Sequence, residues 1–174
     1  MRAMRRLTAT STSLGLAVAG LILGTGATAH ASGCSQDYLP LPDPVCQPGA
    51  YNPDVTQDTI GSTICVSGWT STVRPSTSYT NALKVRQIAE YGYEDTSTAD
   101  YEEDHLVPLE LGGAPKSAEN LWPEPRYGDT TAANKDTVEN KLKKAVCNGT
   151  VGLDDAREAV ASDWTTALSS LGLS

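Results

Sequence analysis

Four cysteines downstream of a predicted export signal are the strongest constraint on how this chain folds. The first six residues carry three arginines, an apolar stretch follows at 14–23, and Ala29-His30-Ala31 supplies the small residues that a signal peptidase recognises. We therefore predict that residues 1–31 are a cleaved signal and that the protein is secreted. Two alternatives are a retained anchor, for which the apolar stretch is shorter than the required ~20 residues, and a lipoprotein, because residues 31–34 loosely resemble a lipobox.

An even number of cysteines in an exported chain indicates disulfide bonds. Four cysteines allow three pairings, and the close C-x-x-C spacing of a metal site is absent. We favour Cys34 with Cys46 and Cys65 with Cys147, because the first two lie in a proline-rich arm that has little else to hold it. The second bond would close a loop of about 80 residues and constrain the unfolded chain by about 4 kcal/mol.

Composition limits the class of protein. The 143 residues after the signal suffice for one domain with its own core. They retain all 21 acidic residues but only ten basic ones, a formal charge of −11, which is the wrong sign for casual binding to nucleic acid. Any nucleic-acid substrate must therefore be held by a local cluster of basic side chains.

The first half of the mature chain predicts an extended arm followed by a segment of mixed secondary structure. Residues 32–62 contain five prolines and predict an extended arm, while residues 63–174 form the domain proper. Residues 63–73 favour one or two strands interrupted at Gly68. Residues 78–91 predict a helix, and most of the six carboxylates at 94–104 are expected in a solvated loop that lacks the EF-hand calcium pattern.

The second half predicts two helices. Residues 131–147 place apolar side chains on one face, and Asn148-Gly149 ends the helix. Asp154 is the expected N-cap of the next helix, with a buried stripe formed by Ala156, Val160, Trp164 and Leu168. Together these elements predict an α+β fold.

One stretch carries a pattern with chemical meaning. Residues 101–113 read Tyr-Glu-Glu-Asp-His-Leu-Val-Pro-Leu-Glu-Leu-Gly-Gly, and Asn120 begins Asn-Leu-Trp-Pro-Glu-Pro. Asp104-His105 stands where a short apolar strand is expected to begin, Gly112-Gly113 permits a turn, and a second apolar run and then a helix follow Asn120. The order is strand, loop, strand, helix around one Asp-His pair.

This pattern resembles the HNH nucleases, whose ββα-metal motif reads D-H-[IV]-x-P-L, then Gly-Gly, an Asn-Leu step and a helix. The flanks at 66–75 and 120–125 are also similar to those of small secreted actinobacterial proteins with this motif. The resemblance implies a ββα-metal core and a secreted, metal-dependent endonuclease that hydrolyses phosphodiester bonds of DNA, or of RNA, with little sequence choice.

The resemblance also implies roles for three residues. Hydrolysis needs a base that deprotonates water near neutral pH, which suits the imidazole of His105. The negative charge that develops on the phosphoryl oxygens needs a metal cation to stabilise it, and Asp104 would be a ligand of that cation. Asn120 would hold the loop and orient His105. Adjacent strand residues point to opposite sides, so both roles require a bend there or a metal at the strand edge.

The last metal ligand is open, because many HNH motifs end in histidine and His105 is the only histidine left after signal removal. Asn134 and its rival Glu139 both lie on the last helix, and Lys135 would contact the scissile phosphate. One histidine with oxygen ligands favours Mg²⁺ or Mn²⁺ over Zn²⁺. Five bases against three acids between residues 126 and 148, with Lys141, Lys143 and Lys144 together, supply a locally positive helix.

Two other functions remain open at this point. The protein could be a secreted binding module that has the ββα scaffold but no catalytic activity. The net charge and the missing final histidine favour this alternative. A hydrolase of a cell-wall polymer could use Asp104 and Glu103 as paired carboxylates, although adjacent residues rarely face one bond. As partners we expect nucleic acid and no membrane after signal cleavage, with the protein a monomer; an inhibitor protein is left open.

Overall fold

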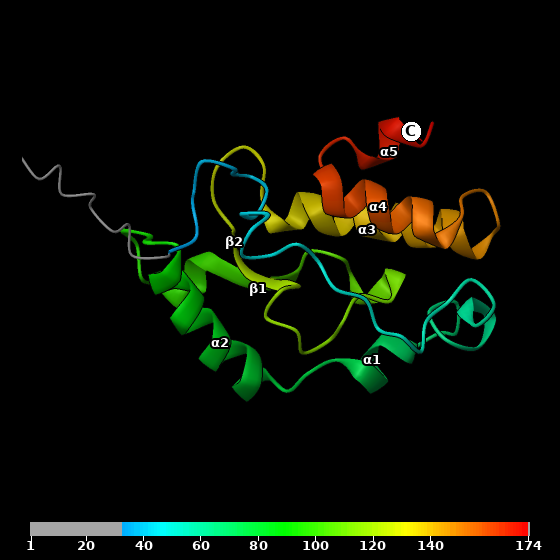
Figure 1. Ribbon diagram of the computed structural model, residues 1–174, viewed down its shortest axis with the longest axis horizontal. Coiled ribbons are helices and arrows are strands. Elements are labelled where there is room, and N and C mark those ends of the chain that lie inside the picture. Colours follow the sequence, from blue (N-terminus) through cyan, green and yellow to red (C-terminus); the bar gives the residue numbers. More distant parts are fainter. Residues whose placement is uncertain (1–32, 174) are drawn as a thin grey trace, which may run out of the picture. The chain divides into compact units, whose positions relative to one another are not determined.

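The computed structural model describes residues 33–173 and shows an α+β fold, as predicted. Among these residues no helix is both long and apolar enough to cross a membrane. The predicted signal at 1–31 lies outside the described residues. In chain order the elements of Figure 1 are η1 (Ile60–Ser62), α1 (Trp69–Val73), α2 (Thr77–Glu90), η2 (Thr98–Asp100), β1 (Tyr101–His105), η3 (Leu109–Leu111), β2 (Leu121–Pro125), α3 (Ala132–Cys147), α4 (Leu153–Asp163) and α5 (Ala167–Ser170).

The sheet is an antiparallel pair, β1 and β2, in which Asp104 pairs with Trp122 and His105 with Leu121. Figure 1 shows this pair lying between α2 and α3. The strand expected after Asn120 is confirmed. The prediction that a strand begins at Asp104-His105 is wrong, because β1 ends at His105. After Leu106, the backbone N–H and C=O of Val107 form hydrogen bonds with the Asn120 side chain and not with another strand.

The two longest helices occur where they were predicted. The Ser76 hydroxyl accepts from the backbone N–H of Tyr79 at the start of α2, and Gly92 follows its end with φ of 65°, the left-handed conformation that favours glycine. Thr131 and Asn134 form a capping box at the start of α3. Local capping chemistry thus places both boundaries.

The start of α4 was predicted two residues too late. Gly152 is the N-cap and Leu153 opens the helix, so Asp154 sits in the first turn, where its carboxylate interacts favourably with the helix dipole. Ala156, Val160 and Trp164 are buried as expected, but the helix ends at Asp163, and Leu168, which belongs to α5, is only partly buried. The buried guanidinium of Arg157 donates from α4 to the carbonyl of Leu111 at 2.8 Å and to that of Val55 at 2.9 Å.

The strand prediction for residues 63–73 is wrong. This segment makes turns, with N–H to C=O bonds from Val66 to Thr63 and from Trp69 to Val66, and then the short helix α1. Gly68, with φ of 79°, redirects the chain before α1. The β-branched residues favoured a strand, but among the described residues they have no partner strand, and Ile64 is instead buried in the core.

The apolar core has two parts. The larger part joins the arm, the loop after β1, α3 and the C-terminal helices; its fully buried members are Val55, Ile64, Val107, Leu111, Leu142, Val146, Leu153, Ala156, Val160, Trp164 and Ala167. The smaller part is mainly aromatic and contains Ile88, Tyr91, Tyr93, Tyr101 and Trp122. The smaller part packs the hairpin against the end of α2, and the larger part packs α3 against the loop after β1 and α4.

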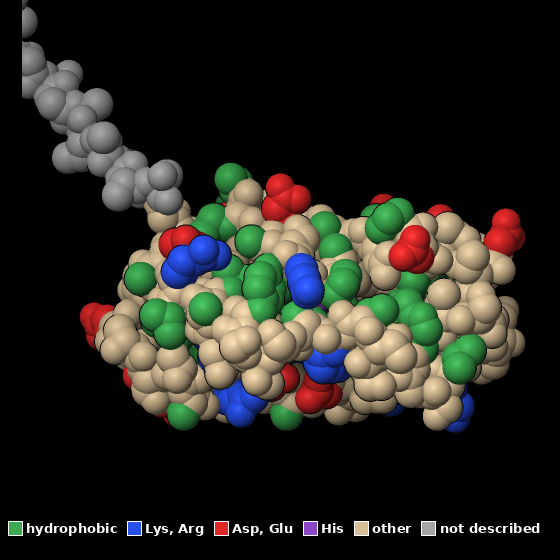
Figure 2. Space-filling view, turned by 90° about the horizontal axis from the view of Figure 1, so that it is seen from below, with side chains coloured by type: hydrophobic (Ala, Val, Ile, Leu, Met, Phe, Trp, Pro, Cys, Tyr) green, Lys and Arg blue, Asp and Glu red, His purple; other side chains and the backbone are tan. Residues whose placement is uncertain are grey.

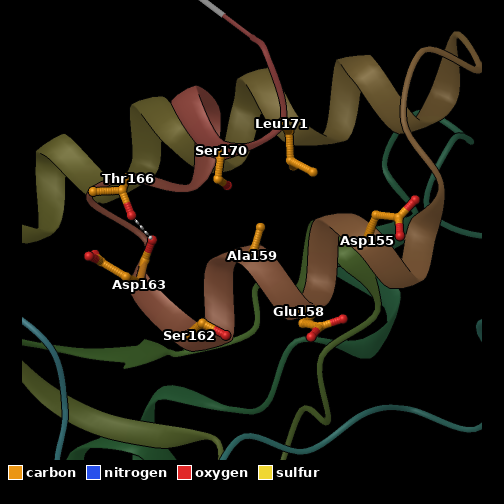
Figure 3. Close-up of a pocket in the computed structure, with 8 residues that line it drawn as sticks. All are labelled: Asp155, Glu158, Ala159, Ser162, Asp163, Thr166, Ser170 and Leu171. Carbon is orange, nitrogen blue, oxygen red and sulfur yellow. Dashed lines mark hydrogen bonds between the residues drawn. The ribbon is translucent and has the colours of Figure 1, made fainter.

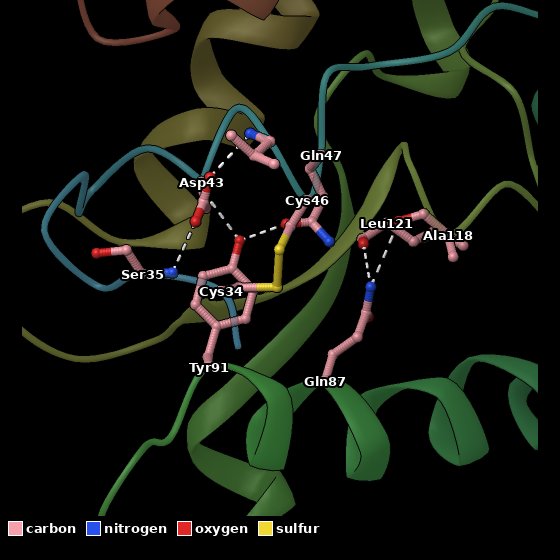
Figure 4. The surroundings of a disulfide bond; sticks show 10 residues. Cys34, Ser35, Asp43, Cys46, Gln47, Gln87, Tyr91, Ala118 and Leu121 are labelled. Carbon is pink, nitrogen blue, oxygen red and sulfur yellow. Dashed lines mark hydrogen bonds between the residues drawn. A yellow bond between two sulfur atoms is a disulfide. The ribbon is translucent and has the colours of Figure 1, made fainter. Parts of the chain in front are cut away.

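Both predicted disulfides are present, Cys34–Cys46 within the arm and Cys65–Cys147 between the segment before α1 and the end of α3. Two disulfides are compatible with an extracellular protein. Figure 4 shows how the first anchors the arm beside α2. The Tyr91 hydroxyl accepts from the backbone N–H of Asp43 at 3.0 Å and donates to Gln47, so the arm is bonded to the end of α2.

Candidate catalytic site

His105 lies at the end of β1 and is 4% exposed. Its Nε2 lies 3.1 Å from the carbonyl oxygen of Pro115. A carbonyl can only accept, so Nε2 carries the proton of the neutral ring and Nδ1 keeps its lone pair. Burial lowers the pKa of His105, and the nearby Lys135 and Arg74 charges lower it further while Asp104 opposes them. The ring is thus a neutral base at neutral pH.

Asn120 holds the loop that follows His105. Its Oδ1 accepts from the N–H of Val107 at 2.9 Å, and its Nδ2 donates to the carbonyls of Val107 at 3.0 Å and Ala114 at 3.2 Å. Gly113 lies against the same carbonyl, because a Cβ there would stand 1.8 Å from the oxygen of Val107. Asn120 acts on the loop that carries the acceptor of His105 rather than on the ring itself.

Lys135, which the resemblance would place against the scissile phosphate, is buried between α3 and the hairpin. It is 1% exposed, and its ammonium donates to Oδ2 of Asp104 at 2.6 Å, to the carbonyl of His105 at 2.7 Å and to Oε1 of Glu139. In this arrangement the ammonium protons of Lys135 are donated to protein oxygens and not to a substrate phosphate. The packing of α3 on the hairpin puts the ammonium against the strand end, where three oxygens accept its three protons.

Glu124 adds a third carboxylate beside this cluster. It is 1% exposed, and neither of its carboxylate oxygens has a hydrogen-bond partner among the described residues. Burial raises the pKa of Glu124 well above its usual value, and the charge of Asp104 raises it further. Burial likewise raises the pKa of Glu139, to about 7. Sequence reasoning missed Glu124, and the only local signal is its place within an otherwise apolar strand.

The predicted metal ligands do not fit a divalent ion in this arrangement. The side-chain oxygen of Asn134 accepts hydrogen bonds from the N–H of Thr131 at 2.8 Å and from the Thr131 hydroxyl at 3.0 Å. This oxygen is therefore part of the helix cap. Oxygens of Asp104 and Glu139 are bound to the Lys135 ammonium. Within residues 33–173, no three His, Cys, Asp or Glu side chains are grouped to hold a metal.

The predicted basic cluster on α3 is divided between two faces. Lys143 pairs with Glu110 of η3 at 3.2 Å and is half-buried. Lys141 and Lys144 line a separate hollow together with the chain near Gly172. Figure 2 shows that the face formed by α1 and α2 also carries Lys and Arg side chains, with carboxylates and apolar groups between them. Positive charge is dispersed rather than gathered in one stripe.

Glu103 is a further carboxylate with buried oxygens, which the sequence placed in a solvated loop. Both of its oxygens are buried without a hydrogen-bond partner in the described part of the chain. Burial raises the pKa of Glu103 to about 8, while Lys84 on α2 opposes the rise. The solvated-loop expectation is wrong here, because residues 101–104 belong to β1 and pack between two helices.

We expect Glu103→Gln to make the protein more stable at pH 8. An unfolded glutamic acid loses its proton near pH 4.5, but the folded protein retains it to about pH 8. The folded state therefore binds more protons across this window, and the free energy of unfolding falls as pH rises. Gln stays neutral in both states, so the variant should gain a few kcal/mol at pH 8 and lose much of the slope. Urea unfolding at pH 5 and pH 8 measures both quantities.

The exposed carboxylate of Glu119 provides the control for this measurement. Glu119→Gln should leave the dependence of unfolding free energy on pH close to that of the parent. Glu124 and Glu139 remain in both variants and preserve part of the slope. A Glu103→Gln protein that is less stable than the parent at pH 8 would show that Glu103 is ionised and stabilising in the fold.

A hollow of about 360 Å³ lies between α4 and α5, away from these residues (Figure 3). It is lined by Asp155, Glu158, Ala159, Ser162, Asp163, Thr166, Ser170 and Leu171. None of the candidate site residues contributes to it. Its carboxylates face solvent, so the buried titratable groups of the hairpin remain the chemically unusual feature of the molecule.

Comparisons with protein-family models, with curated proteins and with solved structures found no match. The fold and site define the chain as an α+β protein with two disulfides and a two-stranded antiparallel sheet. One strand of that sheet ends in a buried histidine held by a backbone carbonyl.

Proposed function

We propose that this protein is a secreted endonuclease of the HNH type, which hydrolyses phosphodiester bonds of DNA, or of RNA, with low sequence specificity. One observation carries the proposal. The imidazole of His105 is held through Nε2 by the carbonyl of Pro115, which leaves Nδ1 as an unprotonated acceptor. A fixed neutral imidazole is the group that general-base hydrolysis requires.

In the proposed reaction, Nδ1 of His105 takes one proton from a water molecule as its oxygen attacks phosphorus. The P–O ester bond to the leaving oxygen breaks, and that oxygen accepts a proton from solvent. The bond from Nε2 to Pro115 strengthens as the ring becomes positive, because a charged donor makes a stronger hydrogen bond. Asn120 supports this step by holding the loop that presents Pro115.

The order of elements is consistent with the resemblance to HNH nucleases. A two-stranded hairpin is followed directly by α3, and Lys135 from the first turns of α3 returns to the end of β1 beside His105. This arrangement supports the proposal, because in a ββα core a helix completes a site begun on the hairpin. The Asp-His pair, the Gly-Gly turn and the Asn-Leu step keep the spacing of the motif.

A binding module without turnover is the second candidate, and one observation favours it. His105 is only 4% exposed, so a substrate phosphate must reach a base that is almost covered. In such a module Asn120 and Lys135 would serve only to hold the hairpin against α3. Activity decides between the two candidates.

The test is incubation of the purified secreted protein with supercoiled plasmid and with RNA, each with EDTA and with added Mg²⁺ or Mn²⁺. We expect nicking of the plasmid and fragmentation without discrete sequence-specific bands. Cleavage in any of these conditions by protein purified free of host nuclease supports the nuclease. Intact substrates in every condition would instead assign the binding module.

A further inference from the structure

We infer that the ammonium group of Lys135 is the resident cation of this site, bound by Asp104 and Glu139 in place of the divalent ion predicted for them, and that it positions His105. The assignment of a catalytic purpose to this cation rests on the proposed nuclease function. The assignment of the cation itself does not, because it can be measured by metal binding.

The surroundings of the Lys135 ammonium have the chemistry of a hard-cation site. All three of its acceptors are oxygens, two from the carboxylates of Asp104 and Glu139 and one from the carbonyl of His105. Carboxylate and carbonyl oxygens are also the ligands that Mg²⁺ and Mn²⁺ prefer. An ammonium has three protons to donate, so these acceptors satisfy it completely.

The charge of the cluster requires a permanent cation. Asp104 and Glu139 bond to one buried ammonium, and a buried carboxylate is costly without a compensating charge. Burial alone would lower the pKa of Lys135, but the neighbouring carboxylates, Asp104 first, hold it above its ordinary value. The ammonium is therefore charged at every pH at which the protein would act.

The bonds of Lys135 reach the catalytic base directly. The carbonyl that accepts from its ammonium is that of His105, and the carboxylate of Asp104 is the preceding side chain on β1. Lys135 thus fixes the end of the strand against α3 from one side, while Pro115 fixes the ring from the other. Because it acts through His105 and is itself covered, Lys135 is a positioning residue.

Metal binding to the parent protein gives the first test and needs no variant. We expect Mn²⁺, followed by its electron paramagnetic resonance signal and by calorimetry, to show no site that depends on Asp104. We also expect cleavage to persist in EDTA. A stoichiometric Mn²⁺ site in the parent that disappears in Asp104→Asn, with cleavage lost in EDTA, would overturn the inference and leave the nuclease proposal standing.

Removal of the ammonium gives the second test. Lys135→Met keeps much of the side-chain volume and leaves the carboxylates without their cation, so it should bind Mn²⁺ at least about tenfold more tightly than the parent. Mn²⁺ should also raise its unfolding temperature and restore kcat with little change in KM. Lys143→Met is the matched control, because it removes a half-buried ion pair on the same helix and should gain no Mn²⁺ affinity.

The outcomes separate the two proposals. If the parent cleaves no substrate, the nuclease proposal fails, and the Mn²⁺ comparison still tests the cation. If Lys135→Met folds only when Mn²⁺ is present, the ion has replaced the ammonium and the inference holds. If Lys135→Met folds without metal and binds Mn²⁺ no better than Lys143→Met, the carboxylates do not form a cation site and the inference is wrong.

Discussion

His105→Gln is expected to lower kcat for phosphodiester hydrolysis by about 10²–10⁴-fold, which is the usual contribution of a general base. Glutamine places an amide N–H near the position of Nε2 and can still donate to the carbonyl of Pro115. It cannot take a proton from water. The variant therefore removes the base and retains the contact that holds the loop, so its unfolding temperature should stay close to that of the parent.

The rate as a function of pH provides an independent readout of the same residue. Only the neutral ring accepts a proton, and burial lowers the pKa of His105 below its usual 6.5. The rate should therefore rise with pH to a plateau reached at or below neutrality, and His105→Gln should lose this rise. Glu158→Gln, on the exposed side of α4, is the control and should cleave like the parent. Parental cleavage rates in a contaminant-free His105→Gln preparation would contradict the mechanism.

Removal of the Cys65–Cys147 bond is expected to cost about 4 kcal/mol of unfolding free energy. The bond joins residues 82 apart in sequence, so its loss frees a long loop in the unfolded chain. In the fold it joins the segment that contains the buried Ile64 to the end of α3. The Cys65→Ala, Cys147→Ala double variant should unfold at a temperature on the order of 10 °C lower, as followed by circular dichroism.

The shorter bond provides the comparison for this experiment. Cys34–Cys46 joins residues only 12 apart, and its removal should cost about 3 kcal/mol in the same entropy model. The arm also keeps the hydrogen bond that the Asp43 N–H donates to the Tyr91 hydroxyl and the one that this hydroxyl donates to Gln47. An equal or larger loss of stability for the Cys34→Ala, Cys46→Ala variant would mean that native-state packing of the arm outweighs loop length.

The sequence by itself determined the features that depend on neighbours in the chain. Capping residues such as Ser76, Thr131 and Gly92 place the boundaries of α2 and α3, because a helix end is satisfied by side chains within a few residues. The Asn-Leu step at Asn120 opens β2 as expected. The cysteine pairing that the proline-rich arm favoured is the one observed, although the sequence left all three pairings open.

Only the tertiary structure decided which charged groups are buried. Glu103 and Lys135 have no local signal that separates them from surface residues, and Glu124 has only its place within an apolar strand. Their burial results from packing a two-stranded hairpin between α2 and α3. The same packing leaves residues 63–73 without a strand to pair with, so their β-branched side chains enter the core from turns and α1. Long-range contacts therefore outweigh local propensity at the places where the chemistry of the site is set.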